Sequence, residues 1–211
     1  MLYFDFHHHN SNTDFGIYNV KFNDELPKTY FSAGIHPDSF SEDLEQKFDW
    51  LERMAVLENC VAIGECGLDA RYENADLQKH VFEKQIMLAN EVQKPLIIHC
   101  VKSFPAIIEI CRNADVPVVI HGFNKRKTIG DELLEKQFML SFGKSLMYNV
   151  NLQAFFKEMP PNRFFIETDS ADIEIEKLYQ KAAELRNITI EELNLQIPEN
   201  LKSINLPLQN G

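Results

Sequence analysis

Short apolar runs alternate along the chain with longer segments in which apolar residues recur every three or four positions. The short runs are typical of buried strands, and the longer segments have the period of amphipathic helices. The predicted strands are Leu2–His7, Phe15–Val20, Tyr30–Ile35, Cys60–Gly64, Pro95–Cys100, Pro117–Ile120, Phe138–Phe142 and Arg163–Glu167. The predicted helices are Asp43–Leu57, Leu77–Val92, Phe104–Cys111, Thr128–Lys136, Val150–Glu158 and Glu174–Arg186. The tail Ile197–Gly211 is interpreted as polar and partly loose at its end.

Strands that alternate with helices imply parallel β-α-β units. The pattern therefore predicts the α/β class and a single (β/α)8 TIM-like barrel over residues 1–211, a length near the ~200-residue lower end for that fold. The stretch from Asn10 to Lys28 is too short for two full helices and a strand. We therefore expect a distorted barrel with helices missing near the N-terminus, and no composition shift marks a second domain.

The net charge and the lengths of the apolar runs limit the classes of partner that we expect. The 21 basic and 32 acidic residues give a net charge of -11, which argues against a broad basic face that coats duplex DNA. A metal pocket made of carboxylates is compatible with this charge, because bound cations neutralise it. No run approaches the ~18 apolar residues of a membrane span, and the N-terminal segment lacks the features of a signal peptide. We expect a cytoplasmic protein with no membrane partner.

Histidines and carboxylates follow the predicted strands at their C-terminal ends. These residues are His7, His9, His36, Glu65, His99, His121 and Asp169. In a parallel barrel all these ends meet at one face, where barrel enzymes keep their active sites. The two-residue spacing of His7 and His9 places both side chains on the same side of a strand. A single such histidine is more often a hydrogen-bonding residue than a ligand, but this many at one face favour a metal site.

The residue types indicate which ions fit. Imidazole and carboxylate together suit Zn, Mn, Ni or Fe, and carboxylate with water also tolerates Mg. A carboxylate such as Glu65 can bridge two divalent ions. Two ions ~3.5–4 Å apart can stabilise both the attacking and the leaving oxygen of a phosphoryl displacement. The residue types thus predict a site for divalent metal ions, drawn from Zn, Mg, Mn or Ni, in which two ions can be accommodated.

Other residues have ordinary structural interpretations. We expect His8 to be exposed or to lie behind the ligands, His80 to be a surface residue, and His36 to form a pocket wall rather than a ligand. The four cysteines form no CxxC pair, so we expect free thiols in a reducing compartment. Cys66 and Cys100 each follow a candidate ligand directly, so strand alternation turns them toward the core.

Several motifs occur together in a characteristic order. They are His-x-His at His7 and His9, GIHP at Gly34–Pro37, AIGECGLD at Ala62–Asp69, KPLIIHC at Lys94–Cys100, VVIHGF at Val118–Phe123, ETDS at Glu167–Ser170, and Asn200 in an AAEL…EEL…N pattern. As a set, from Asp5 to Ile204, the sequence resembles the TatD family of metal-dependent deoxyribonucleases within the amidohydrolase-like barrel enzymes.

The resemblance implies hydrolysis of DNA phosphodiesters with two divalent metals. It implies that one ion is held by His7, His9, Glu65 and Asp169, and the other by Glu65, His99 and His121. Glu65 and Asp169 are then the catalytic carboxylates, with Asp169 taking a proton from the water, and Glu167 orients a ligand. The alternative for Asp169 is a cap of the helix that follows at Ile173.

The sequence departs from the family pattern around the substrate. Val101 stands where the family usually has an arginine, and Lys102 follows it. The Pro-Tyr and long loop that usually follow the ETDS-like motif are missing after Ser170, and the segment between His9 and Gly34 is short. The candidate substrate contacts are His36, Arg71, Lys102 and Lys125, the last in a basic cluster, Lys125, Arg126 and Lys127.

The leading hypothesis is a metal-dependent phosphodiesterase that uses a water activated by two metals, acting on DNA ends, single strands or another phosphodiester. A second hypothesis is a hydrolase of amide, lactone or aminoacyl-ester bonds at the same metal centre, since fold alone does not fix the substrate. The acidic net charge favours a small or short substrate. A third hypothesis is a non-catalytic metal-binding barrel. The sequence assigns no oligomeric state.

Overall fold

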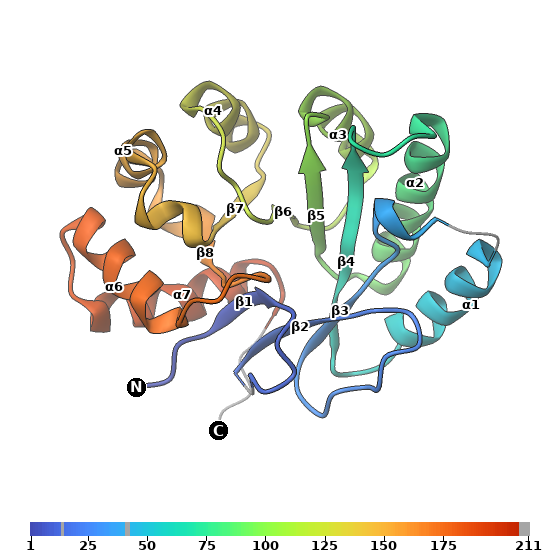
Figure 1. Cartoon of the computed structure of the whole chain (residues 1–211), viewed down its shortest axis with the longest axis horizontal. Coiled ribbons are helices and arrows are strands. Elements are labelled where there is room, and N and C mark those ends of the chain that lie inside the picture. Colours follow the sequence, from blue (N-terminus) through green and yellow to red (C-terminus); the bar gives the residue numbers. More distant parts are fainter. Residues whose placement is uncertain (14, 41–42, 207–211) are drawn as a thin grey trace.

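The computed structural model describes residues 1–13, 15–40 and 43–206, and its centre is a sheet of eight parallel strands in chain order (Figure 1). The strands are β1 (Asp5–His8), β2 (Gly16–Val20), β3 (Phe31–Ala33), β4 (Cys60–Asp69), β5 (Leu96–Val101), β6 (Val118–Ile120), β7 (Met139–Phe142) and β8 (Phe164–Ile166). A bridge between His8 and Asp169 joins the end of β8 to β1. The sheet is therefore a nearly closed barrel, as predicted.

Helices surround the barrel except at its first strands. They are α1 (Leu44–Ala55), α2 (Ala75–Val92), α3 (Phe104–Ile110), α4 (Lys127–Glu135), α5 (Val150–Glu158), α6 (Ile175–Arg186) and α7 (Ile190–Ser203). Short 3₁₀ turns lie at η1 (Pro37–Ser39), η2 (Cys111–Asn113), η3 (Lys144–Met147) and η4 (Pro161–Arg163). No helix interrupts the described residues from β1 to β3, which confirms the predicted loss of helices near the N-terminus.

The core follows the apolar periods of the sequence. α2 buries Val81, Phe82, Ile86 and Ala89 along one stripe, and the larger apolar cluster fills the barrel from β4 to β8. A second cluster lies under β2, β3 and α1 and includes Trp50. The first strands therefore contribute to both clusters, since Phe6 of β1 and Ile17 of β2 belong to the larger one.

β4 is longer than the predicted strand, which ended at Gly64. It continues to Asp69 because two glycines let it lie very close to β5. A Cβ at Gly64 would lie 2.4 Å from the carbonyl oxygen of Ile97, and one at Gly67 would lie 2.2 Å from that of His99. Both residues also have φ values in the left-handed half of the map, which favours glycine. The extension carries Glu65 and Asp69 into the barrel mouth.

The prediction of a polar tail from Ile197 is wrong for residues 197–203, which form the last part of a helix with a buried apolar face. Residues 190–203 form α7, which begins at a capping box between Thr189 and Glu192. Ile197 and Leu201 are buried, and Nδ2 of Asn200 donates to the carbonyl oxygens of Pro161 and Phe164. The helical spacing of these apolar residues was present in the sequence, but Pro198 lies within it. Residues 207–211 of the predicted tail lie outside the described residues.

The expectations for the cysteines and His80 are confirmed, whereas one expectation for His8 is wrong. All four cysteines are free and buried, and His80 is exposed, as predicted. Of the two alternatives for His8, exposure is wrong: this last residue of β1 is buried, and its ring lies 5.8 Å from that of Tyr18 on β2. Among the described residues, no helix has both the length and the apolar content that crossing a membrane requires.

Candidate metal centre

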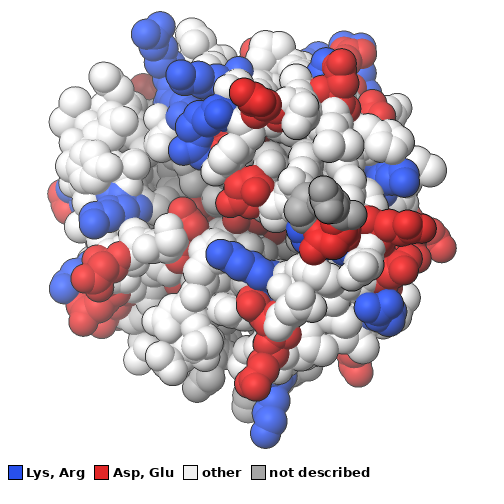
Figure 2. All heavy atoms as spheres, turned by 45° about the vertical axis from the view of Figure 1, so that its right-hand side comes forward, with Lys and Arg blue, Asp and Glu red and all other residues white. Residues whose placement is uncertain are grey.

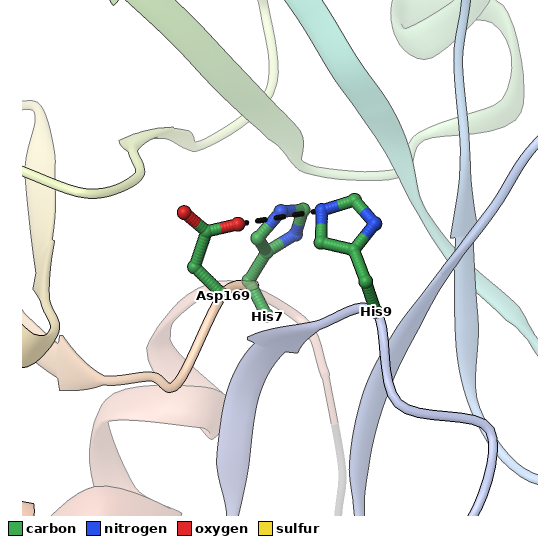
Figure 3. Close-up of side chains that lie close together, drawn as sticks. All are labelled: His7, His9 and Asp169. Carbon is green, nitrogen blue, oxygen red and sulfur yellow. Dashed lines mark ion pairs between the residues drawn. The ribbon is translucent and has the colours of Figure 1, made fainter. Parts of the chain in front are cut away.

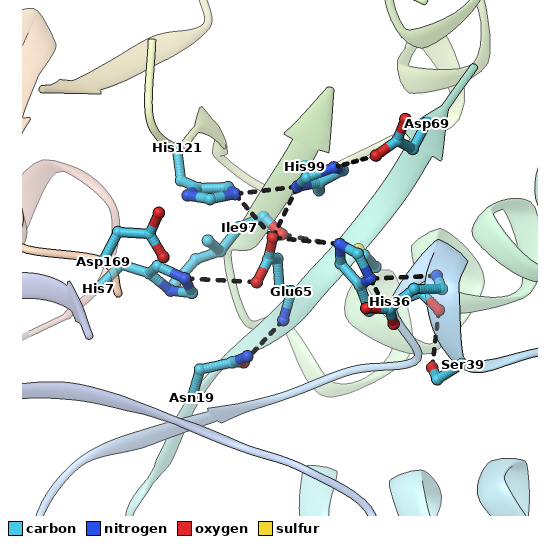
Figure 4. Close-up of polar contacts among 12 residues, drawn as sticks. His7, Asn19, His36, Ser39, Glu65, Asp69, Ile97, His99, His121 and Asp169 are labelled. Carbon is cyan, nitrogen blue, oxygen red and sulfur yellow. Dashed lines mark hydrogen bonds and ion pairs between the residues drawn. The ribbon is translucent and has the colours of Figure 1, made fainter. Parts of the chain in front are cut away.

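The carboxyl ends of the strands bring all six predicted metal ligands into one cluster, and His36 joins them (Figures 3 and 4). The cluster draws on β1, β4 and β5 and on the segments that follow β3, β6 and β8. Its members are His7, His9, His36, Glu65, His99, His121 and Asp169. The prediction that the strand-end side chains lie together is therefore correct in geometry.

The Glu65 carboxylate lies at the middle of the cluster. Its Oε1 is 2.7 Å from Nδ1 of His99 and 2.8 Å from Nε2 of His121 (Figure 4). Its Oε2 is 3.5 Å from Nε2 of His7 and 3.7 Å from Nε2 of His9. Burial raises the pKa of Glu65, but the His121, His7 and His99 imidazoles lower it further, to well below its usual value. Glu65 is thus an ionised carboxylate with one oxygen toward each histidine group.

The junction of β1 with β8 positions a second group. Asp169 Oδ1 is 3.3 Å from Nε2 of His9, and His7 lies beside both (Figure 3). The Asp169 amide donates to the His7 carbonyl at 2.9 Å, and the His9 amide donates to the Asp169 carbonyl at 3.2 Å. The backbone bonds that close the barrel therefore also set the spacing of these side chains.

Asp169 does not cap a helix. The next helix, α6, begins at Ile175, and Glu174 occupies its N-cap position. Burial raises the pKa of Asp169, but its hydrogen bond with His9 and the nearby His121 and His7 rings bring it below the usual value. The helix-cap alternative is therefore wrong, and the carboxylate is ionised at neutral pH.

Three histidines of the cluster have one ring nitrogen close to the carboxylate of a second residue, in addition to the nitrogen that faces Glu65. Nε2 of His99 is 3.0 Å from Asp69 Oδ2, and Nδ1 of His121 is 3.4 Å from Glu167 Oε1. Nδ1 of His36 is 2.6 Å from Asp38 Oδ1, while its Nε2 is 3.4 Å from Glu65 Oε1. Metal-ligating histidines characteristically hold their second nitrogen against a carboxylate, which fixes the ring and raises its basicity.

Asp69 is a candidate site residue that the sequence reasoning did not assign. It is fully buried, and its carboxylate accepts from Nε of Arg71 at 3.0 Å as well as facing His99. Gln78 holds the turn: its side chain accepts from the Asp69 amide and donates to three backbone carbonyls. The available signal was a carboxylate two residues after Gly67, on a strand that was predicted to be shorter.

Glu167 has the orienting position that the resemblance implied. Its Oε1 accepts from the Gly122 amide at 2.7 Å, and Ser141 Oγ donates to its Oε2. The side chain is completely buried. Both carboxylate oxygens of Glu167 thus accept a hydrogen bond, and Oε1 also faces His121.

The cluster fits a divalent metal. His7 is completely buried; its Nε2 lies 3.5 Å from Glu65 Oε2, but neither ring nitrogen forms a hydrogen bond among the described residues. An unpartnered buried polar group costs ~1–3 kcal/mol, and a bound cation would satisfy it. Three sets of ligand atoms lie within 4.8 Å of one another: His7, His9 and Asp169; His7, Glu65 and His121; and His36, Glu65 and His99. The third set includes His36, which was expected only as a pocket wall.

A cavity of about 590 Å³ opens onto the cluster. Among the predicted substrate contacts, His36 lines it, whereas Arg71, Lys102 and Lys125 are absent from its described lining. Arg71 is paired with Asp69, Lys102 is exposed with φ 55°, and Lys125 is half-buried.

The three residues of the basic cluster, Lys125, Arg126 and Lys127, do not act as one surface group. Lys127 is the first residue of α4 and pairs with Asp131 and Glu158, at 3.0 and 3.3 Å. The face shown in Figure 2 carries basic and acidic side chains together, with one group of basic side chains at its upper left. This face of the molecule is therefore mixed in charge.

Fold and cluster together define the class: a parallel α/β barrel with a candidate metal centre at the carboxyl ends of its strands. A family model described as TatD related DNase matches residues 18–205, so the chain belongs to this family. The prediction of a TatD-family metal-dependent hydrolase is confirmed.

Relatives and structures agree with this assignment. The chain is 29% identical to the uncharacterized metal-dependent hydrolase YabD of Bacillus subtilis, over 86% of this chain and 79% of YabD. It is 28% identical to the 3'-5' ssDNA/RNA exonuclease TatD of Citrobacter rodentium, covering 76% of this chain and 64% of that protein. The chain therefore spans less than two thirds of that exonuclease.

Two solved structures share the fold. The TatD homologue YJJV of Escherichia coli has a TM-score of 0.80 at 17% identity, covering 97% of this chain and 98% of YJJV. A TatD family hydrolase of Entamoeba histolytica has a TM-score of 0.76 at 14% identity, covering 99% of this chain and 98% of that one.

Proposed function

We propose that this protein hydrolyses phosphodiester bonds of DNA or a related polynucleotide with the help of two divalent cations. The observation that carries the proposal is the position of Glu65, whose two carboxylate oxygens face different histidine groups. A carboxylate shared in this way suits two neighbouring ions, an arrangement common in phosphatases and nucleases. The exonuclease name of the relative in Citrobacter rodentium supports a nucleic-acid substrate.

The residues assigned to the ions are those that the resemblance implied. His7, His9, Glu65 and Asp169 would hold one ion, and Glu65, His99 and His121 the other. The sets of ligand atoms that lie within 4.8 Å of one another group His121 with His7 and Glu65, and His99 with His36 and Glu65. This nitrogen and oxygen set suits Zn, Mn or Ni, and Mg is the alternative. When bound, such ions lower the pKa of a coordinated water and stabilise the charge that develops on the phosphate oxygens.

The protein's own groups have separate tasks in this proposal. Asp169 is ionised and only half-covered, with its side chain 40% exposed, so it can accept a proton from the attacking water. Asp69 and Glu167 hold His99 and His121 by their outer nitrogens. His36 lines the cavity and directs Nε2 toward Glu65, where it can donate to a phosphate oxygen.

The remaining cations are proposed as outer phosphate contacts. Lys102 follows β5 and Lys125 follows β6, so both stand near the carboxyl ends of these strands. Arg71 keeps part of its guanidinium exposed, although Asp69 holds its Nε. Their contribution would be electrostatic, and it would decrease as salt is added.

One panel of measurements tests the proposal. Metal content is measured by elemental analysis, and the metal-loaded protein is assayed on phosphodiester, carboxylic ester, lactone and amide substrates. We expect two ions per chain and phosphodiester turnover that is lost with a chelator and regained with metal. Selective cleavage of amides or lactones would replace the proposed substrate class. Bound metal without turnover on any substrate would favour a non-catalytic barrel.

The cytoplasmic location expected from the sequence remains a prediction.

A further inference from the structure

The backbone of β4 leaves its regular pairing with β5 at the residue that lies in the middle of the metal cluster. The pairing register shifts between Ile63 and Cys66, so that Gly64 and Glu65 together stand opposite the single residue Ile97 of β5. A bulge of this kind bends its strand and re-aims a side chain, and it leaves backbone groups outside the ladder. The direction of the Glu65 carboxylate therefore depends on what holds the backbone of this bulge.

A side chain from a strand that does not pair with β4 holds the Glu65 amide. Asn19, on β2, accepts from this amide through Oδ1 at 3.0 Å (Figure 4). The strand between them, β3, ends at Ala33, which pairs with Ile63, so Glu65 lies just beyond its reach. A Cβ at Gly34 would lie 2.7 Å from the Glu65 carbonyl oxygen. The bulge is thus confined by Gly34 and hydrogen-bonded by Asn19.

The Asn19 side chain is itself oriented from β3. Ser32, its partner in the pairing of β2 with β3, donates from Oγ to the same Oδ1 at 3.2 Å. Ser32 is completely buried, and Asn19 is 5% exposed. The oxygen of a side-chain amide accepts hydrogen bonds, whereas its nitrogen only donates. A flipped Asn19 amide would turn its nitrogen toward the N–H of Glu65, so only the observed orientation satisfies both donors.

We propose that Asn19 is a positioning residue of the metal centre. Its Oδ1 holds the Glu65 amide, and with it the bulge, so that the two Glu65 carboxylate oxygens face different histidine groups. The inference rests on the two-metal site of the proposed function, although it does not depend on the substrate. Groups that hold a metal ligand by hydrogen bonds are each worth ~10–100-fold in metal affinity.

Hydrogen exchange in the metal-free, full-length protein tests whether Asn19 holds the bulge. We expect the Glu65 amide to exchange ~10-fold faster in Asn19→Leu, which removes the acceptor at similar volume, than in the wild type. Asn19→Asp keeps an acceptor oxygen and should restore slow exchange. The Ile63 amide, which donates to the Pro95 carbonyl at 2.9 Å, is the internal reference and should not change. Equal exchange of the Glu65 amide in the wild type and Asn19→Leu would overturn the proposal.

Metal affinity tests whether the bulge positions the carboxylate. Zn²⁺ is titrated into the metal-free proteins in competition with a chelating dye, and Asn19→Leu should bind it ~10–100-fold more weakly than the wild type. Asn200→Leu is the matched control, because Asn200 is also buried and its Nδ2 donates to the carbonyls of Pro161 and Phe164 at the start of β8. It should lower the melting temperature and leave Zn²⁺ affinity unchanged. Equal losses of affinity in the two variants would show that Asn19 supports only the fold.

The remaining outcomes separate this inference from the function on which it rests. Zn²⁺ binding without phosphodiester turnover would end the proposed function alone, whereas a wild-type protein that binds no divalent metal would end both. Faster exchange of the Glu65 amide with unchanged Zn²⁺ affinity would overturn the positioning role. If Asn19→Leu does not fold, Asn19→Ala removes the same acceptor with a smaller side chain and takes its place in both measurements.

Discussion

Asp69 faces Nε2 of His99 at 3.0 Å, and the opposite nitrogen of the same ring lies 2.7 Å from Glu65. The buried carboxylate therefore fixes both the ring plane and the nitrogen that is presented to the metal cluster. Burial raises the pKa of Asp69, but hydrogen bonds from Arg71 and the contact with His99 lower it far below its ordinary value. Asp69 is consequently ionised and able to polarise the imidazole.

We predict that Asp69→Asn lowers metal affinity ~10–100-fold, which is the usual cost of losing a partner behind a metal-ligating histidine. The measurement is competitive titration of the metal-free protein with a chelating dye. Asp115→Asn, an exposed carboxylate at a distance from the cluster, is the control. Unchanged affinity in Asp69→Asn would mean that the carboxylate serves only to hold Arg71.

The histidines that face Glu65 carry a second prediction. We expect His99→Ala and His121→Ala each to remove metal from one site and to reduce activity at least ~10-fold, since a direct ligand should matter more than its supporting carboxylate. His80→Ala should change neither quantity, because His80 is exposed on α2. Elemental analysis of all three variants makes the comparison. Full metal content in His99→Ala and His121→Ala would contradict the ligand assignment.

The candidate ligands could be predicted because a local pattern encodes them. A polar residue directly after an apolar strand lies at the carboxyl end, and parallel pairing brings these ends together. The spacing of His7 and His9 places them on one side of β1. The missing helices were also predictable, since the length between Asn10 and Lys28 sets a limit that no tertiary contact can change.

Other features depend on contacts between distant residues. The extension of β4 to Asp69 requires the close approach of Gly64 and Gly67 to β5, which depends on φ values and neighbouring carbonyls. His8 is buried against Gly16 and Tyr18 of β2, whereas alternation along β1 says only that it points away from His7. The contact between Asp69 and His99 joins residues 30 positions apart, so it could not be predicted from the local sequence.

The cysteines give a prediction about pH and reactivity. Burial raises the pKa of Cys60 to about 11 and those of Cys100 and Cys111 to about 12, and raises that of Cys66 as well. The thiolate is the reactive form, so the folded protein should react very slowly with a disulfide reagent at pH 8. All four thiols should react on unfolding. Because these folded-state pKa values exceed the unfolded value of ~8.5, stability should fall as the pH rises from about 9 toward 11.

The control for this experiment is the same reagent on the protein unfolded in denaturant at the same pH. A thiol that reacts in the folded state at the rate of the unfolded chain would show that its site opens readily to solvent. Cys66 and Cys100 are the informative pair, because each adjoins a proposed metal ligand. Protection of both would agree with the alternation that turns them into the core.

The last prediction concerns Asp169, the proposed proton acceptor. Asp169→Asn removes the charge and the basic oxygen but keeps the backbone bonds to His7 and His9 that join β1 to β8. Asp169 has φ 54°, a left-handed conformation that asparagine adopts more readily than most residues. The fold, the melting temperature and at least one metal ion should therefore be retained. Turnover should fall by ~10²–10⁴-fold, the usual contribution of a positioned base.

Two comparisons make that result specific. Asp172→Asn alters an exposed carboxylate three positions further along and should leave turnover unchanged. Asp169→Ala should lower both turnover and the melting temperature, because alanine is disfavoured at a positive φ. If Asp169→Asn melts early yet turns over at the wild-type rate, the residue has a structural role at the barrel junction and some other group accepts the proton. If melting and turnover are both unchanged, the Asp169 carboxylate has neither role. The negative charge that the neighbouring imidazoles stabilise would then have no effect on the reaction.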